Sequence, residues 1–272
     1  MDHSKLNIAV LGAGNIGTAI ASGLKESGRF EPSRLTLTRR RLHLLDDYKE
    51  QGFNVHSDNI KAVENASVII LAVEPHQLDG LLNEIKPALK PDKHVLISVV
   101  SGATITQIKR KVPDEVRIVR AMPNTAIAIR ESMTCISSHD GDEKSIKLTK
   151  AIFDTVGKTL LIPEEEMTSA TALGACGIAF FLRAIRAASQ GGIEIGFHAH
   201  DALMIAAQTA KGAASLLTMA EHHPEFEIDR VTTPKGCTIS GLNQMEHNGF
   251  SSAMIKGILV SAEKAARLYT DE

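Results

Sequence analysis

The sequence predicts an α/β protein in two parts: an N-terminal doubly wound parallel sheet over residues 1–163 and an all-α C-terminal part over residues 164–272. Up to Pro163, short β-rich runs alternate with helical or turn-rich segments, which is the rhythm of parallel strands covered by helices on both faces. Beyond Pro163 the chain is rich in Ala, Gly, Leu and Ile, with helical periodicity and no clear strand. We place the domain boundary at this change.

Eight strands are expected in the first part, at Asn7–Leu11, Arg34–Thr38, Asn54–His56, Ser67–Val73, Val95–Val99, Arg117–Arg120, Met133–Ser137 and Thr159–Ile162. Two runs, Val68–Val73 and Val95–Val100, are apolar on both faces, which is typical of central strands buried from both sides. In the second part, helices are expected within Glu164–Phe197, Asp201–Glu221 and Ser251–Leu268. The three glutamates that open the first of these suit the positive end of a helix dipole.

Composition excludes several classes of protein. The chain has 272 residues, 43% of them hydrophobic, a length that suggests two domains, and its net charge of -2 gives no basic footprint for nucleic acid. We expect no membrane partner, because no segment reaches about 18 uninterrupted apolar residues and the start has no apolar leader. Three distant cysteines, Cys135, Cys176 and Cys237, have no paired spacing. A cytoplasmic protein is expected.

The most informative motif is a glycine turn between the first strand and the first helix. Gly12 permits the tight turn, Gly14 lets the backbone approach a pyrophosphate, and Gly17 lets the helix pack close to the strand. The phosphates would then meet free amides at a helix N-terminus. This predicts a Rossmann-type domain that binds NAD or NADP. The alternative is a glycine-rich turn without a ligand.

The residues at the end of the second strand distinguish NAD from NADP, because an acidic residue there would hydrogen-bond the ribose of NAD. This chain has Thr38, Arg39 and Arg40 there, and two guanidiniums suit a 2′-phosphate. NADPH is therefore preferred over NADH. The alternative is that Arg39–Arg41 form the solvated start of a helix. Asn59 is a candidate contact to the adenosine, or simply a helix cap.

Three further strand ends carry turn-forming residues: Ala72–Pro75, Ser98–Ile105 and Arg120–Thr125. Each alone is explained as a tight connection. Together, at one edge of an open α/β sheet, they predict a nicotinamide pocket shaped by Pro123 and Asn124.

In the helical part, Asp229–Leu242 places a proline and a glycine in a loop that opens a helix. The amides of Gly236, Cys237 and Thr238 are expected to be unpaired and to bind a small carboxylate, with the Thr238 hydroxyl beside the reacting carbon. The alternative is that Thr238 or Ser240 only caps the helix.

Histidine pairs and glycines of this part have simpler explanations. The pairs His198/His200 and His222/His223 lack the i, i+4 spacing of zinc sites, so no metal is expected. Glycines are costly in helices, which predicts close helix approach, across a subunit interface, around the group Gly174, Gly177, Gly191, Gly192 and Gly196.

A set of segments matches one known family over essentially the whole chain: Gly12–Gly17, Ala72–Pro75, Ser101–Ile105, Met122–Thr125, Gln208–Ala214, Thr233–Leu242 and Met245–Phe250. In their order and spacing, the chain resembles pyrroline-5-carboxylate reductases. The resemblance implies NAD(P)H-dependent reduction of the imine of 1-pyrroline-5-carboxylate to L-proline, a Rossmann domain, and a helical domain that interleaves with a second subunit in a homodimer, often assembled to a decamer.

The resemblance also implies site residues. The family's cofactor positions fall on Leu11, Gly12, Ala13, Gly14, Asn15, Ile16, Thr38, Arg39, Asn59, Ala72, Val73 and Pro75. Its substrate positions fall on Gly236, Cys237 and Thr238, with Arg230 and Thr233 nearby. Hydride addition to a protonated imine needs mainly orientation and exclusion of water, so we assign Thr238 to hydrogen-bond the ring nitrogen.

The chain departs from the family pattern at several positions. Glu74 replaces a lysine near the cofactor, Thr168 an acidic residue, and the stretch Gly174–Ala179 lacks two hydroxyls and a proline. Lys235 stands where glycine is common, which is tolerated if its φ is negative, and Cys237 stands where threonine or alanine is common. Two other functions stay open: a related NADPH-dependent imine or keto-acid reductase, and a non-catalytic NADPH-binding regulator.

Overall fold

A computed structural model of the chain describes residues 5–138, 142–220 and 222–269. The chain divides into two compact units, one formed by Met1–Cys176 with Ser261–Glu272 and the other by Gly177–Val260. The division by compactness therefore falls 13 residues beyond the expected boundary at 163/164, and the C-terminal residues return to the first unit. It does so because the helical segment that follows Pro163 begins by packing on the sheet, where Met167 and Ala172 are fully buried.

The first unit is built on one eight-stranded sheet in the order β3-β2-β1-β4-β5-β6-β7-β8. Its strands are β1 (Ile8–Leu11), β2 (Leu35–Thr38), β3 (Asn54–His56), β4 (Val68–Leu71), β5 (Val95–Ser98), β6 (Arg117–Met122), β7 (Ser132–Ser138) and β8 (Gly157–Leu161). All eight expected strands are present, within a few residues at each end. The two runs expected to be central, β4 and β5, are buried throughout and lie in the middle of the sheet.

The sheet is not wholly parallel, and in this respect the sequence-based expectation is wrong. Strand β7 runs antiparallel to β6, while β8 pairs with β7 in parallel. The reason is the short connection from Pro123 to Glu131, which holds a single 3₁₀ helix, η6 (Thr125–Ile129). A parallel neighbour needs a crossover of a dozen or more residues, so this loop can only reverse the chain.

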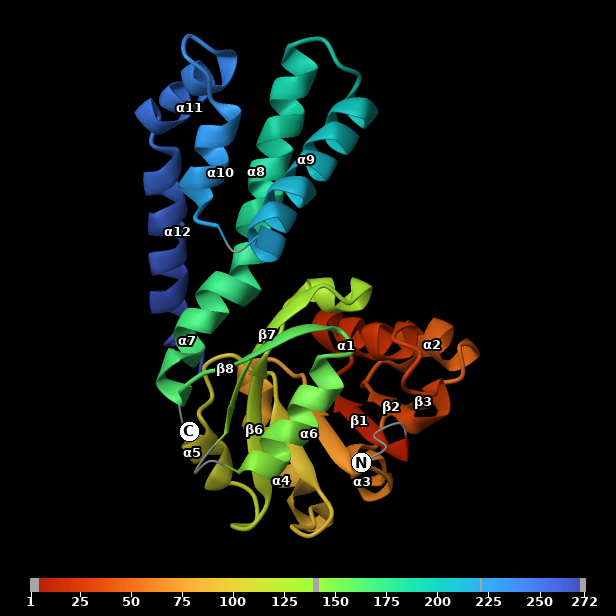
Figure 1. Cartoon of the computed structure of the whole chain (residues 1–272). Helices are drawn as coiled ribbons and strands as arrows, with labels where there is room; N and C mark the ends of the chain where they lie inside the picture. Colours follow the sequence, from red (N-terminus) through yellow and green to blue (C-terminus); the bar gives the residue numbers. More distant parts are fainter. Residues whose placement is uncertain (1–4, 139–141, 221, 270–272) are drawn as a thin grey trace. The chain divides into compact units, whose positions relative to one another are not determined.

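Helices cover both faces of the sheet, as Figure 1 shows. Alternate side chains of β1 pack into two separate hydrophobic cores, Ile8 and Val10 into one and Ala9 and Leu11 into the other. The first core is closed by α1 (Asn15–Glu26) and α6 (Glu143–Phe153), and the second by α3 (Asn59–Asn65), α4 (Leu78–Ile85) and α5 (Ile105–Lys109). The expected doubly wound architecture is confirmed.

Short helices complete the first unit. They are η2 (Pro32–Arg34), η3 (Leu42–Leu45), α2 (Asp46–Glu50), η4 (Pro75–Gln77), η5 (Lys86–Ala88), η8 (Glu164–Glu166), α7 (Met167–Ala170) and a π-helix, η9 (Thr171–Cys176). The acidic run at Glu164–Glu166 starts a helical run, as expected. The second half of the π-helix overlaps the stretch Gly174–Ala179, in which the sequence departs from the family pattern.

The C-terminal end of the chain is held on the first unit. Tyr269 is buried in the second core, and its hydroxyl donates to Asp79 Oδ1 at 2.5 Å. Asp79 also forms an ion pair with Lys111. These bonds keep the pKa of Asp79 below its usual value although burial opposes them. A Cβ added at Gly102 would lie 3.0 Å from the Tyr269 nitrogen, so the segment that follows the last helix packs tightly against the β5–α5 turn.

The second unit is helical over its described residues. Its helices are α8 (Gly177–Glu194), α9 (Ala199–Ala220), α10 (Pro224–Val231), α11 (Cys237–His247) and α12 (Phe250–Ala265), the last of which runs on into the first unit. Glu221, which ends one expected helix, lies outside the described residues. Helices α8 and α9 approach closely at Gly192, where an added Cβ would lie 3.0 Å from Ala202 Cβ. Gly174 and Gly191 have no such neighbour among the residues that the structure describes.

One helical run in the described part, Glu164–Glu194, is long and apolar enough to cross a membrane by length and composition alone. Only 17% of its most apolar window is buried within the chain. A single helix of this kind is weak evidence for a membrane span, because core helices of soluble proteins pass the same test.

Candidate active site

The glycine turn has the geometry that each glycine was expected to allow. Gly12 has a φ of +94°, and a Cβ added there would lie 2.6 Å from Val73 Cγ1. A Cβ added at Gly17 would lie 2.5 Å from the Gly12 carbonyl oxygen. No side chain fits at either position, because the turn reverses on itself and the helix then starts directly against it.

Gly14 differs from its two neighbours, because a Cβ added there would meet nothing within 4 Å. It is the N-cap of α1, and it provides no side-chain cap. The first backbone bond of the helix runs from the Thr18 amide to the Gly14 carbonyl at 2.9 Å. The preceding amides of Asn15, Ile16 and Gly17 are therefore open, and no acidic residue lies in the first turn. A helix N-terminus with open amides and no acidic residue is suited to binding an anion.

The end of β2 lies directly beside this turn. Thr38 pairs with Leu11 in the sheet, and its carbonyl accepts from the amides of Gly12 and Ala13 at 3.2 and 2.8 Å. The segment carries no carboxylate, and the Arg39 guanidinium donates to the Ala13 carbonyl at 3.1 Å. Arg39 is thus bound to the glycine turn, while the following helix η3 begins only at Leu42. The alternative of a solvated helix start does not apply to Arg39.

Asn59 is not a helix cap. Asp58 caps α3 by accepting from the Lys61 amide, whereas the side-chain Oδ1 of Asn59 accepts from the Thr38 hydroxyl at 2.6 Å. The Asn59 amide donates to both carboxylate oxygens of Glu84, at 3.1 and 3.0 Å. Sequence reasoning missed Glu84, because it lies 25 residues away on another helix and belongs to no motif.

The other expected cofactor residues follow β4. The Ala72 amide donates to the Leu11 carbonyl at 2.8 Å, and Val73 packs against Gly12. Pro75 starts η4, and the exposed Glu74 lies 3.4 Å from His76 Nδ1. Leu11 and Ala13 are fully buried, so these two residues offer only backbone atoms.

The three turns expected to form one pocket lie at the same edge of the sheet, since Leu71 pairs with Ser98 and Ser98 with Arg120. Pro123 is buried. The Asn124 side chain accepts from the Ala126 amide at 3.1 Å and donates to the Gly174 carbonyl at 3.2 Å. Asn124 therefore connects this edge to the π-helix and keeps one N–H for other contacts.

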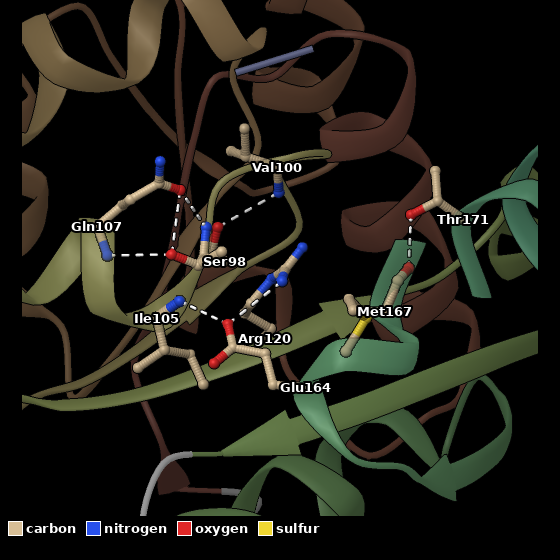
Figure 2. A network of polar contacts seen from close by, with 9 residues as sticks. Ser98, Val100, Ile105, Gln107, Arg120, Glu164, Met167 and Thr171 are labelled. Atoms are coloured by element: carbon tan, nitrogen blue, oxygen red, sulfur yellow. Dashed lines mark hydrogen bonds and ion pairs between the residues drawn. The ribbon is translucent and has the colours of Figure 1, made fainter. Parts of the chain in front are cut away.

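An ion pair between the buried Arg120 and the partly exposed Glu164 at this edge was not expected from the sequence. Figure 2 shows the Glu164 carboxylate between Arg120 and the start of α5. Its Oε1 accepts from Arg120 Nη1 at 3.3 Å and from the Ile105 amide at 2.6 Å. Arg120 is 4% exposed, burial lowers its pKa while Glu164 opposes that shift, and its Nε has no partner among the described residues.

In the second unit, the expected substrate residues form a tight turn before α11. The Gly236 amide donates to the Thr233 carbonyl at 2.9 Å, which closes a turn with Pro234 and Lys235 at its centre. Lys235 has a φ of +61°. A proline followed by a positive φ defines a type II turn, whose third position favours glycine. The condition that φ be negative is not met, so Lys235 occupies this position under strain.

Two expectations about this loop need correction. The Gly236 amide is paired within the turn and is not available to a ligand. Neither Thr238 nor Ser240 caps the helix: the N-cap is Gly236, and the Ser240 hydroxyl donates back to the Gly236 carbonyl at 3.2 Å. The first-turn amides after Gly236, including those of Cys237 and Thr238, remain open, and Thr238 is half-buried.

Arg230 lies near this loop but is held on its own helix. Its guanidinium donates to Glu227 Oε2 at 3.1 Å and lies 6.0 Å from the centre of the Phe226 ring. Among the described residues, no group of three His, Cys, Asp or Glu side chains is placed to bind a metal.

Comparison with known proteins places the chain in a family. A model described as pyrroline-5-carboxylate reductase dimerisation matches residues 164–268, and one described as NADP oxidoreductase, coenzyme F420-dependent, matches residues 7–102. Pyrroline-5-carboxylate reductase 2 of Dictyostelium discoideum is 49% identical over 96% of this chain and 92% of its own length. The chain belongs to the pyrroline-5-carboxylate reductase family. The expectation drawn from the sequence is confirmed.

Further comparisons agree with this family. Pyrroline-5-carboxylate reductase 1 of D. discoideum is 52% identical over 97% of this chain, which spans about half the length of that relative. The crystal structure of Plasmodium falciparum pyrroline carboxylate reductase with NADP bound has a TM-score of 0.89 at 25% identity, covering 98% of this chain and 99% of that one. A Coxiella burnetii pyrroline-5-carboxylate reductase has a TM-score of 0.87 at 29% identity, covering 98% and 99%.

Proposed function

We propose that this protein reduces the ring imine of 1-pyrroline-5-carboxylate to L-proline with NAD(P)H. Membership of the reductase family supports the reaction, and one observation carries the nucleotide part of the proposal. The α1 N-terminus has open amides, no acidic residue and an uncapped Gly14 with free space above it. This arrangement fits the pyrophosphate of a dinucleotide.

NADPH is the preferred cofactor in this proposal. No carboxylate stands at the end of β2, and Arg39 is bound to the glycine turn through Ala13 while keeping further N–H groups for a 2′-phosphate. A relative with NADP bound shares the fold over 98% of this chain. The cofactor contacts would come from Leu11 to Ile16, Thr38, Arg39, Asn59, Ala72, Val73, Pro75 and Asn124.

When bound, the reduced nicotinamide supplies a hydride for the imine carbon. The electron pair of the C=N bond then goes to the ring nitrogen, and the resulting neutral amine takes up a proton from solvent to give the ammonium group of proline. The protein's own residues have to hold the substrate and exclude water, because a protonated imine is already electrophilic. This explains why the chain needs no catalytic metal or nucleophile.

The turn before α11 is the proposed substrate site. The open amides of Cys237 and Thr238 would bind the substrate carboxylate, and the Thr238 hydroxyl, which has no bond within the described chain, would bind the ring nitrogen. Thr233 and Gly236 shape the turn, and Lys235 adds a cation beside it. Arg230 would contact the substrate only after its hydrogen bond to Glu227 is broken.

We further propose a homodimer, assembled into a decamer, in the cytoplasm. Large apolar side chains are exposed along the helices of the second unit, among them Phe181, Leu182, Leu203, Met204, Leu259 and Val260. The family model described as dimerisation matches these helices, so we propose that a second subunit buries their exposed apolar side chains. The free cysteines suit a reducing compartment, and we propose neither a membrane nor a nucleic acid as partner.

The decisive experiment follows the loss of NADPH absorbance when purified protein is mixed with 1-pyrroline-5-carboxylate. Turnover to proline is the expected result, and Thr238→Val should lower kcat while NADPH binding stays near normal. Turnover of another cyclic imine or keto acid alone would identify a related reductase. NADPH binding without any turnover would identify a regulator and end the proposal.

A further inference from the structure

We propose that Glu84 is a positioning residue that weakens the preference of the site for NADPH over NADH. The inference rests on the proposed function, since it concerns the adenosine ribose of the same cofactor. Its basis is a chain of hydrogen bonds that runs from the glycine turn to α4 through the side chains of Thr38, Asn59 and Glu84.

Glu84 determines which group donates and which accepts at each step of this series of hydrogen bonds. A carboxylate only accepts hydrogen bonds, and both of its oxygens lie 3.0 to 3.1 Å from Asn59 Nδ2. The Asn59 amide group must therefore face Glu84, which turns the Asn59 carbonyl oxygen toward Thr38. The Thr38 hydroxyl then donates its one hydrogen to Asn59 Oδ1, at an oxygen-to-oxygen distance of 2.6 Å.

This direction decides what Thr38 offers to a nucleotide. With its proton committed to Asn59, the oxygen of the buried Thr38 offers only lone pairs, one of which the Gly12 amide already approaches at 3.4 Å. A ribose 2′-hydroxyl can donate to these lone pairs, whereas a 2′-phosphate, which is an acceptor at neutral pH, cannot. Arg39 favours the phosphate and the Glu84–Asn59–Thr38 chain favours the hydroxyl, so the site has two opposed determinants.

The charge of Glu84 acts in the same sense. The side chain is exposed and forms no ion pair with any residue that the structure describes, so its negative charge is not neutralised within the protein. Glu84→Gln removes the charge and lets the Asn59 amide turn over, since a glutamine side chain both donates and accepts. The Thr38 hydroxyl would then be free to donate to a phosphate.

The test measures the dissociation constants of NADPH and NADH, by cofactor fluorescence, for the full-length protein and its variants. Glu84→Gln should raise the ratio of the NADH constant to the NADPH constant by about three- to tenfold, the effect of one ordinary hydrogen bond. Glu64→Gln, on the exposed end of α3, removes the same charge without touching Asn59 and should leave the ratio unchanged. The melting temperatures of both variants should stay close to the wild-type value.

A double variant separates the hydrogen-bond chain from a general charge effect. In a Thr38→Val background, Glu84→Gln should change the ratio much less than it does alone. An unchanged ratio for Glu84→Gln, a shift toward NADH, or an equal shift for Glu64→Gln would overturn the inference. If the wild-type protein bound neither nucleotide, the proposed function itself would fail, and that outcome is distinct from all of these.

Discussion

The position that a Cβ of Gly17 would occupy is 2.5 Å from the carbonyl oxygen of Gly12. Helix α1 thus starts in direct contact with the turn that precedes it, and two glycines of the same motif are required by packing within the protein. No contact among the described residues requires a glycine at Gly14, which lies between them. The motif therefore contains two glycines that packing requires and one that packing does not require.

The first prediction uses this difference. Gly17→Ala should destabilise the protein by about 3 kcal/mol, because its Cβ meets backbone that cannot move freely. Gly14→Ala should leave the unfolding midpoint nearly unchanged, since φ is −85° and the space is open, but should weaken NADPH binding at least about tenfold. Urea unfolding and cofactor titration measure both effects. Equal losses of stability in the two variants would contradict this assignment.

The second prediction concerns the strained Lys235. Lys235→Gly should raise the free energy of unfolding by about 0.5 to 1 kcal/mol, because glycine adopts a positive φ without the cost that an L-residue bears. Lys235→Ala removes the same charge but keeps the strain and should bring no such gain. Arg130→Gly, at a φ of +62°, is a matched control in the other unit and should also stabilise. A gain for Lys235→Ala equal to that for Lys235→Gly would show that charge, not backbone strain, is the cause.

The third prediction follows from the unequal burial of Arg120 and Glu164. Glu164→Ala should cost about 3 kcal/mol, because it leaves a guanidinium that is only 4% exposed without its partner. Arg120→Met should cost less, since the Glu164 side chain is 25% exposed and keeps its bond from the Ile105 amide. The double variant should be more stable than Glu164→Ala alone. Thermal unfolding of the four proteins checks this order, and a larger loss for Arg120→Met would refute it.

The fourth prediction is a pH dependence of stability. His94 is fully buried, its Nδ1 accepts from the Lys90 amide, and burial, helped by Lys93 and Lys90, lowers its pKa from 6.5 to about 4. In the unfolded chain, His94 therefore binds a proton below about pH 6.5, whereas in the folded chain it does so only below about pH 4. Stability should fall by about 2 kcal/mol between pH 7 and pH 5 through this residue.

His94→Gln, which does not titrate, provides the comparison for this effect. Its stability should change less than that of the wild-type protein over the same pH interval, as measured by urea unfolding at fixed ionic strength. Parallel curves for the two proteins would assign the pH dependence to other groups.

Local patterns in the sequence predicted most of the fold and part of the site. Short β-rich runs identified all eight strands, and the glycine spacing identified the turn, because these features depend on residues close together in the chain. The absence of a carboxylate at Thr38–Arg40 is likewise visible in the sequence. The roles proposed for Thr238 and the cofactor residues remain predictions that the experiments above address.

Other features were decided only by the tertiary structure. The reversal of β7 depends on how β6 and β7 pair, and the positive φ of Lys235 on how its turn closes. Glu84 and Asn59, Arg120 and Glu164, and Asn124 and Gly174 are 25, 44 and 50 residues apart, and no local signal links such partners. Sequence periodicity records which face of an element is buried, whereas the folded chain decides which distant side chain completes each hydrogen bond.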